Sequence, residues 1–176
     1  MTRPAWLVVG ALLLSLGTLS SACSGKSGDG RALSTRSSTA TATPDARATL
    51  IAAARDAIDE DHRMSVRVLW TNSVPTKPLA TAGPALAVLR HSVAVRARRG
   101  IRVRLVAEHF RVIRIDLDPS YQRATAIVSD PQRVRPYGRD GRPLGHAVTL
   151  NERARLELRR LGSSTRFVVW RVTAIT

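Results

Sequence analysis

The spacing of apolar residues divides the chain into three successive parts. An apolar run extends from Trp6 to Leu16, whereas the stretch from Ser24 to Thr43 has Leu33 as its only large aliphatic side chain. Apolar residues then return, first at helical spacing and, from Ile101 onward, at every second position. This pattern predicts a leader, a flexible tether and an α+β domain, with boundaries at 1–22, 23–44 and 45–176.

The helical part of the pattern predicts two amphipathic helices. The first begins at Thr43-Pro44-Asp45, where Thr43 suits the N-cap and Pro44 the first helical position. It continues for about 20 residues at helical spacing. Its expected buried face consists of Leu50, Ala54, Ala57, Ile58 and Asp61.

The segment from Ser65 to Ala82 carries Trp70, Pro75 and Pro78, and the prolines argue against one continuous helix there. A second helix is predicted from Gly83-Pro84 to Gly100, where a glycine suits the position after the last turn. Its apolar stripe consists of Leu86, Leu89, Val93 and Ala97.

Alternation of apolar and polar residues predicts antiparallel strands over the remainder. The third strand, Tyr121 to Val128, is expected to end at the turn signal Ser129-Asp130-Pro131. The last 30 residues predict a hairpin, with Trp170 in the core on the same face as Val168 and Val172. Helices followed by strands indicate an α+β fold in which N-terminal helices pack in a curved antiparallel sheet, a cone-like, cystatin-like α+β roll.

The N-terminal part has the order of an export signal: Arg3, the apolar run, and small residues before Cys23. Cys23 is the only cysteine, and Leu19-Ser20-Ser21-Ala22-Cys23 resembles the lipobox of bacterial lipoproteins. In that family the cysteine is lipidated and becomes the new N-terminus. Ser20 departs from the pattern, which usually has leucine three residues before the cysteine.

Two other readings of this segment stay open. The signal could be an ordinary secretory one cleaved near Ala22, or the run could remain as an anchor, although it is shorter than the roughly 20 residues a spanning helix needs. The lipoprotein interpretation places the protein on the extracytoplasmic face of the cell membrane, held by lipid at Cys23.

The chain is strongly basic, with 28 Lys+Arg against 13 Asp+Glu and a formal net charge of +15. Only Lys26 and Lys77 are lysines, an arginine bias typical of GC-rich genomes. Export removes nucleic acid as a partner. The surplus charge instead indicates an anionic envelope surface as a candidate partner, besides other envelope proteins.

The predicted domain is similar to the nuclear transport factor two-like cone, and more narrowly to small actinobacterial lipoproteins and Mce-associated proteins of that fold. The residues that carry the resemblance are Leu117-Asp118-Pro119, Arg123 to Val128, Asp140-Gly141-Arg142-Pro143 and Val169-Trp170-Arg171-Val172. The resemblance implies an accessory, binding or scaffold module of the cell envelope without catalysis.

The same fold hosts pocket-based isomerases, cyclases and dehydratases of the SnoaL-like type, which remain the alternative. Such enzymes place a carboxylate or histidine base in the cone. The candidate pocket residues here are Asp56, His62, Trp70, His109 and Tyr121. No pair has a spacing that demands acid–base work, so no catalytic residue is assigned.

No cofactor or metal is expected from sequence spacing. The four histidines, His62, His91, His109 and His146, are scattered without the short spacing typical of zinc ligands, and Cys23 lies far from the folded part.

Overall fold

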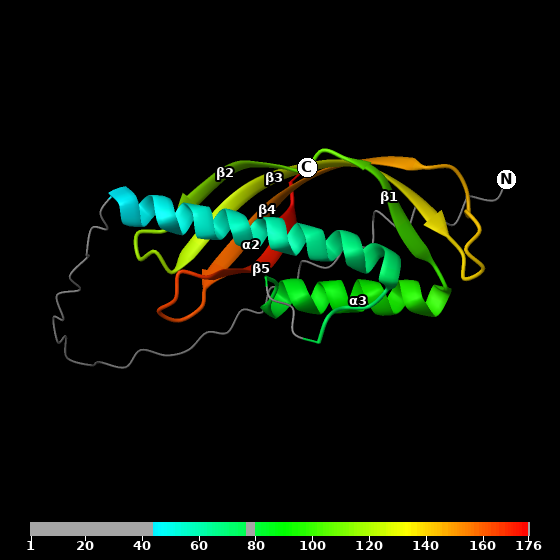
Figure 1. Ribbon diagram of the computed structural model, residues 1–176, viewed down its shortest axis with the longest axis horizontal. Coiled ribbons are helices and arrows are strands. Elements are labelled where there is room, and N and C mark those ends of the chain that lie inside the picture. The colour runs from blue at the N-terminus through cyan, green and yellow to red at the C-terminus, as the bar shows by residue number, and fades with distance from the viewer. Residues whose placement is uncertain (1–43, 77–79, 176) are drawn as a thin grey trace, which may run out of the picture.

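The computed structural model describes residues 44–76 and 80–175. The expected leader, the lipid attachment at Cys23 and the tether lie outside these residues. Within these residues two helices precede five strands (Figure 1): α2 (Pro44–Thr71), α3 (Gly83–Arg99), β1 (Arg102–Glu108), β2 (Arg111–Leu117), β3 (Arg123–Tyr137), β4 (Val148–Arg160) and β5 (Phe167–Ala174). The protein is therefore α+β, as the sequence predicts. Among the described helices, none combines the length and apolar character needed to cross a bilayer.

The strands form one antiparallel sheet built around the long strand β3. On one side β3 pairs with β4, which pairs with β5. On the other side β3 pairs with both β1 and β2, which meet its C-terminal and N-terminal halves. The pairing register with β3 is the same on both sides of His109-Phe110. Glu108 lies opposite Gln132, and three residues later on the edge Arg111 lies opposite Ser129, three residues earlier on β3. β1 and β2 are thus one edge strand with an interruption.

Pro131 explains the interruption. Its carbonyl oxygen accepts a hydrogen bond from the backbone N–H of His109 at 3.0 Å, so the backbone polar groups of residue 131 point toward the edge strand. Proline has no N–H to return the bond. The prediction that Ser129-Asp130-Pro131 ends the third strand is wrong: β3 continues to Tyr137, and the missing donor interrupts its neighbour instead.

Both helices pack on one face of the sheet (Figure 1). α2 contacts β1, β2 and β5, and α3 contacts β5. The predicted helix residues Leu50, Ala54, Ala57 and Ile58 are buried against the sheet, as expected. The sheet side of this core consists of Ala124, Ala126, Val128, Leu156, Leu158, Phe167 and Val169.

α2 is longer than the sequence indicates. It extends through 28 residues to Thr71, so Ser65 to Trp70 are helical and the prolines act only beyond the helix end. Trp70, a candidate pocket residue, is 41% exposed on the last turn, where its ring meets Tyr137 edge-on at 5.6 Å. α3 ends at Gly100 as predicted, with φ of 67°, although Ala97 of its expected stripe is exposed.

The terminal hairpin forms, but its buried residues differ from those predicted. Val169 lies opposite Leu158 and Arg171 opposite Glu157, which leaves Trp170 as the extra residue of a bulge. Val168 is buried as predicted, and so are its neighbours Phe167 and Val169, whereas Trp170 is half-buried and Val172 is 52% exposed. The bulge changes which residues face the helices, and periodicity alone cannot locate it.

Candidate functional site

Polar side chains interrupt the row of β3 residues that faces the helices. Ala124, Ala126, Val128 and Val134 occupy this row and are buried. Asp130 and Gln132 lie between Val128 and Val134 in the same row, because side chains alternate along a strand. Glu108 lies opposite Gln132, and Glu152 on β4 lies opposite Asp130. Three carboxylates thus meet on the helix-facing side of the sheet, where the edge strand is interrupted.

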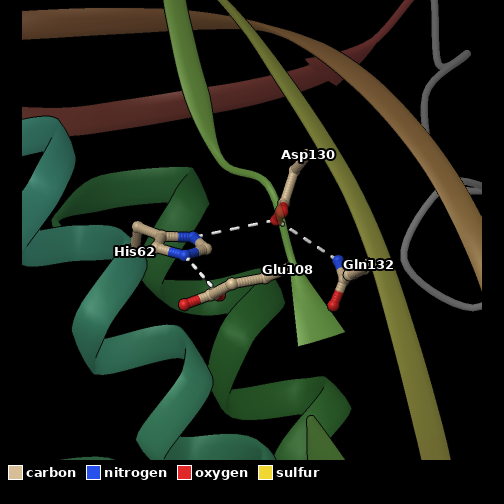
Figure 2. Close-up of polar contacts among 4 residues, drawn as sticks. All are labelled: His62, Glu108, Asp130 and Gln132. Atoms are coloured by element: carbon tan, nitrogen blue, oxygen red, sulfur yellow. Dashed lines mark hydrogen bonds and ion pairs between the residues drawn. The ribbon is translucent and has the colours of Figure 1, made fainter. Parts of the chain in front are cut away.

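His62 on α2 points into this group (Figure 2). Its Nε2 donates to Oε2 of Glu108 at 2.9 Å, and its Nδ1 lies 3.7 Å from Oδ2 of Asp130. The side chains of His62 and Asp130 are only 15% and 16% exposed, whereas Glu108 is 41% exposed. The imidazole is therefore held between two carboxylates, and Glu108 lies on the solvent side.

Two neighbours fix the orientation of these groups. The ring of Phe110, in the strand interruption, stacks on the imidazole with a centroid distance of 4.0 Å. Nε2 of Gln132 donates to Oδ2 of Asp130 at 3.3 Å, as Figure 2 shows. The other oxygen of Asp130, Oδ1, is buried and has no hydrogen-bond partner among the described residues. A buried acceptor of this kind is costly unless something else satisfies it.

The carboxylates of the cluster repel one another. Burial raises the pKa of Asp130; the charge of His62 opposes this rise and that of Glu108 adds to it. Burial, followed by the charge of Asp130, likewise raises the pKa of Glu152. Within residues 44–76 and 80–175, neither arginine nor lysine forms an ion pair with Glu108, Asp130 or Glu152.

Asp61 is next to His62 on α2 but contacts Thr81 instead of the carboxylate cluster. It accepts a short hydrogen bond from the hydroxyl of Thr81, which is buried beside β5. Thr81 is held there because the backbone of Ala80 and Ala82 bonds to Val169 at 2.7 and 2.9 Å. Burial raises the pKa of Asp61 to about 6, against the effects of the Thr81 hydrogen bond and the His62 charge.

The other expected pocket residues do not join His62. Asp56 is exposed on α2, and Trp70 lies at the end of that helix against Tyr137. His109 is exposed and, between Glu108 and Phe110, falls on the opposite side of the edge strand. Tyr121 packs against the core beyond the end of β2.

Sequence reasoning missed Glu108, Asp130 and Glu152. The available signal was the polar pair Asp130 and Gln132 in an otherwise apolar alternation from Ala124 to Val134. That signal is hidden when Pro131 is taken as a turn. His62, Glu108 and Asp130 offer ligand atoms that all lie within 4.8 Å of one another, an arrangement that could hold a metal ion.

Comparisons with known proteins support the fold. No family model and no curated protein matches the chain. The solved intermembrane space region of the chloroplast protein ARC6 aligns with 76% of this chain and 98% of its own, at a TM-score of 0.57 and 11% identity. A protein from Catenulispora acidiphila aligns with 74% of this chain and 93% of its own, at a TM-score of 0.41 and 16% identity. The similarity to the ARC6 region is one of fold alone.

Proposed function

We propose that the protein is a lipoprotein of the cell envelope that acts as a non-catalytic accessory or binding module at an anionic surface. The lipid at Cys23 would hold it on the extracytoplasmic face of the membrane, and residues 24–44 would link the anchor to the domain. The proposal includes the finer fold assignment, a nuclear transport factor two-like cone of the cystatin-like type.

The observation that carries this proposal is the chemistry of the sheet face turned away from the helices. This outer face bears arginines on every strand: Arg104, Arg111, Arg114, Arg123, Arg133, Arg135, Arg153, Arg155, Arg159 and Arg171. The carboxylates on it are Asp116 and Glu157.

Two cross-strand pairs on the outer face place like charges directly opposite. Arg104 lies opposite Arg135, and Arg123 lies opposite Arg159. Like charges in directly opposed positions destabilise a sheet. A lipid surface with anionic headgroups offsets that repulsion, and each basic residue near such a surface gains about 1 kcal/mol.

The filling of the helix-facing side supports a module without catalysis. Large apolar side chains such as Ile58, Leu158 and Phe167 occupy this side, each 1% exposed. Four of the five candidate pocket residues, Asp56, Trp70, His109 and Tyr121, lie apart from His62, as described above. The ARC6 region, described as lying in an intermembrane space, is compatible with an extracytoplasmic location.

Anchoring is tested by metabolic labelling with a fatty-acid analogue. Cys23→Ser should abolish the label and release the protein from the membrane fraction. Label that persists in the variant would contradict lipidation at Cys23.

Surface binding is tested with vesicles and the chain from Ser24 to Thr176. It should bind anionic vesicles more than neutral ones, and salt should weaken this binding because exposed charges are screened. Replacing Arg133 and Arg153 with glutamine should weaken binding by about tenfold or more. The matched control replaces Arg63 and Arg90, exposed on the helices, and should lose much less. Equal losses of vesicle binding in the two variants would contradict a specific role for the outer face and would indicate that its arginines reflect a compositional bias.

A further inference from the structure

We propose that His62, Glu108 and Asp130 bind a divalent transition-metal ion, with Zn²⁺ as the first probe. The site lies at the interruption between β1 and β2, on the side of the sheet away from the outer face. It goes beyond the proposed surface binding and does not depend on it. It also replaces the expectation, drawn from histidine spacing, that the chain holds no metal.

The ligand atoms of the three residues lie near one another. They lie within 4.8 Å of one another, and the Nε2 of His62 is 2.9 Å from Oε2 of Glu108. Ligands about 2.1 Å from a tetrahedral zinc ion are separated by about 3.4 Å. An ion binds one ring nitrogen of His62, so coordination through Nε2 beside Glu108 requires Asp130 to turn from its present place, 3.7 Å from Nδ1, toward the ion.

The donor set fits a transition metal better than a harder cation. The number of protein ligands, three with one open position, is that of catalytic zinc sites, although those sites usually supply two or three nitrogen or sulfur ligands. Imidazole favours zinc-type ions over magnesium or calcium, which prefer oxygen ligands alone. The exposed side of Glu108 gives an ion in solution a path to the site.

The carboxylates of the cluster concentrate negative charge that a bound cation would offset. Glu108, Asp130 and Glu152 bring three carboxylates together, and no arginine or lysine among the described residues pairs with them. A divalent ion would offset two of these negative charges, and imidazole is a common ligand of such ions.

The surroundings hold the ligands as metal sites usually require. Gln132 orients Asp130 from the same strand, and Phe110 fixes the plane of the imidazole. Ordering of this kind around the ligands commonly changes metal affinity by 10- to 100-fold. The unpartnered Oδ1 of Asp130 is a buried acceptor that an ion would satisfy if the carboxylate bound it through both oxygens or turned toward it.

The test uses the full chain in detergent, without a histidine tag and with Cys23→Ser so that no thiol competes for metal. After treatment with a chelator, titration calorimetry should show about one equivalent of bound Zn²⁺. Because the ion binds the folded state, saturating Zn²⁺ should raise Tm by several degrees.

His62→Gln should weaken Zn²⁺ binding by tenfold or more and abolish the rise in Tm, whereas His146→Gln, in an exposed loop, should do neither. If His62→Gln fails to fold, Glu108→Gln provides the same test, with Glu157→Gln on the outer face as its control. The proposal is overturned if 1 mM Zn²⁺ does not bind, or if both site variants bind it as the parent does. Tight Mg²⁺ binding that does not need His62 would also overturn it.

Discussion

The ring of Phe110 lies flat against the imidazole of His62, with an angle of 10° between their planes. Phe110 occupies the interruption of the edge strand, and His62 lies on the helix that covers it. The interruption caused by Pro131 therefore also provides the aromatic surface on which His62 rests. A backbone irregularity and the position of a titratable side chain are linked through this one contact.

The stacking should be measurable as a coupling energy. Phe110→Leu keeps an apolar side chain but loses the ring, and should cost about 1 kcal/mol of unfolding free energy beyond the change in burial. In a His62→Gln background the same change should cost less, because the stacked partner is already gone. Denaturant unfolding of the double-mutant cycle measures the difference. A coupling of zero would mean that the two rings contribute independently.

Because of the bulge in β5, Phe167 should contribute more to the unfolding free energy than Trp170, the residue that the sequence places in the core. Phe167 is 1% exposed, so Phe167→Ala should cost about 3–5 kcal/mol of unfolding free energy. Trp170→Ala should cost less, because the ring is half-buried and packs on Gly83 and the guanidinium of Arg159, which lies 4.0 Å from its centroid. Thermal and urea unfolding of both variants decide the order. A larger loss at Trp170 would contradict the described hairpin.

Asp61 should make stability fall as the pH rises. Its pKa is about 6 in the folded protein against 3.8 for an unperturbed aspartate, so between these pH values the folded state holds a proton that the unfolded state has released. The stabilisation is complete below pH 3.8 and is lost as the pH passes about 6, by about 3 kcal/mol. Asp61→Asn should therefore be more stable than the parent at pH 7 and similar to it at pH 4.

The matched control for this pH effect is Asp56→Asn, on the exposed side of the same helix. Its unfolding free energy should follow the parent at both pH values. Parallel curves for Asp61→Asn and the parent would show that Asp61 does not titrate as described.

Alanine substitutions at two glycines with positive φ distinguish the energetic cost of backbone strain from that of a steric clash. At Gly83, with φ of 54°, an added Cβ would lie 2.8 Å from the ring of Trp170. At Gly141, with φ of 74°, it would meet nothing within 4 Å. Both alanine variants incur about 1–2 kcal/mol of backbone strain, and Gly83→Ala should lose about 1–3 kcal/mol more. Trp170→Ala should recover the additional loss in Gly83→Ala, as chemical unfolding would show.

The sequence predicts the helices, their order and the α+β class because each signal is local. The buried stripe of α2 from Leu50 to Ile58 follows helical spacing, and Gly100 ends α3 through its own backbone freedom. The extension of α2 to Thr71 escapes prediction because Pro75 and Pro78 argue against one helix over the whole segment from Ser65 to Ala82, although both prolines lie beyond the end of α2. Packing of Val68 against the rest of the fold, where it is 1% exposed, accompanies that last part of the helix.

The His62 cluster is harder to predict because its members come from four elements. His62, Glu108, Asp130 and Glu152 approach one another only through the register of β3 with its neighbours and the packing of α2 on the sheet. Asp130-Pro131 is an ordinary turn signal by local chemistry. Asp130-Pro131 can lie within β3 because the backbone polar groups of Pro131 point toward an edge strand, and an edge strand can be interrupted. This relationship is visible only in three dimensions.

The edge formed by β1 and β2 has a consequence for association between copies of the protein. It is bulged near Val106 and near Ile113, which are 50% and 53% exposed, and it is interrupted between these points. An incoming strand needs a straight, evenly spaced row of free N–H and C=O groups, which this edge does not offer. The irregularity at Pro131 therefore protects the sheet against edge-to-edge aggregation at the same place where it positions His62.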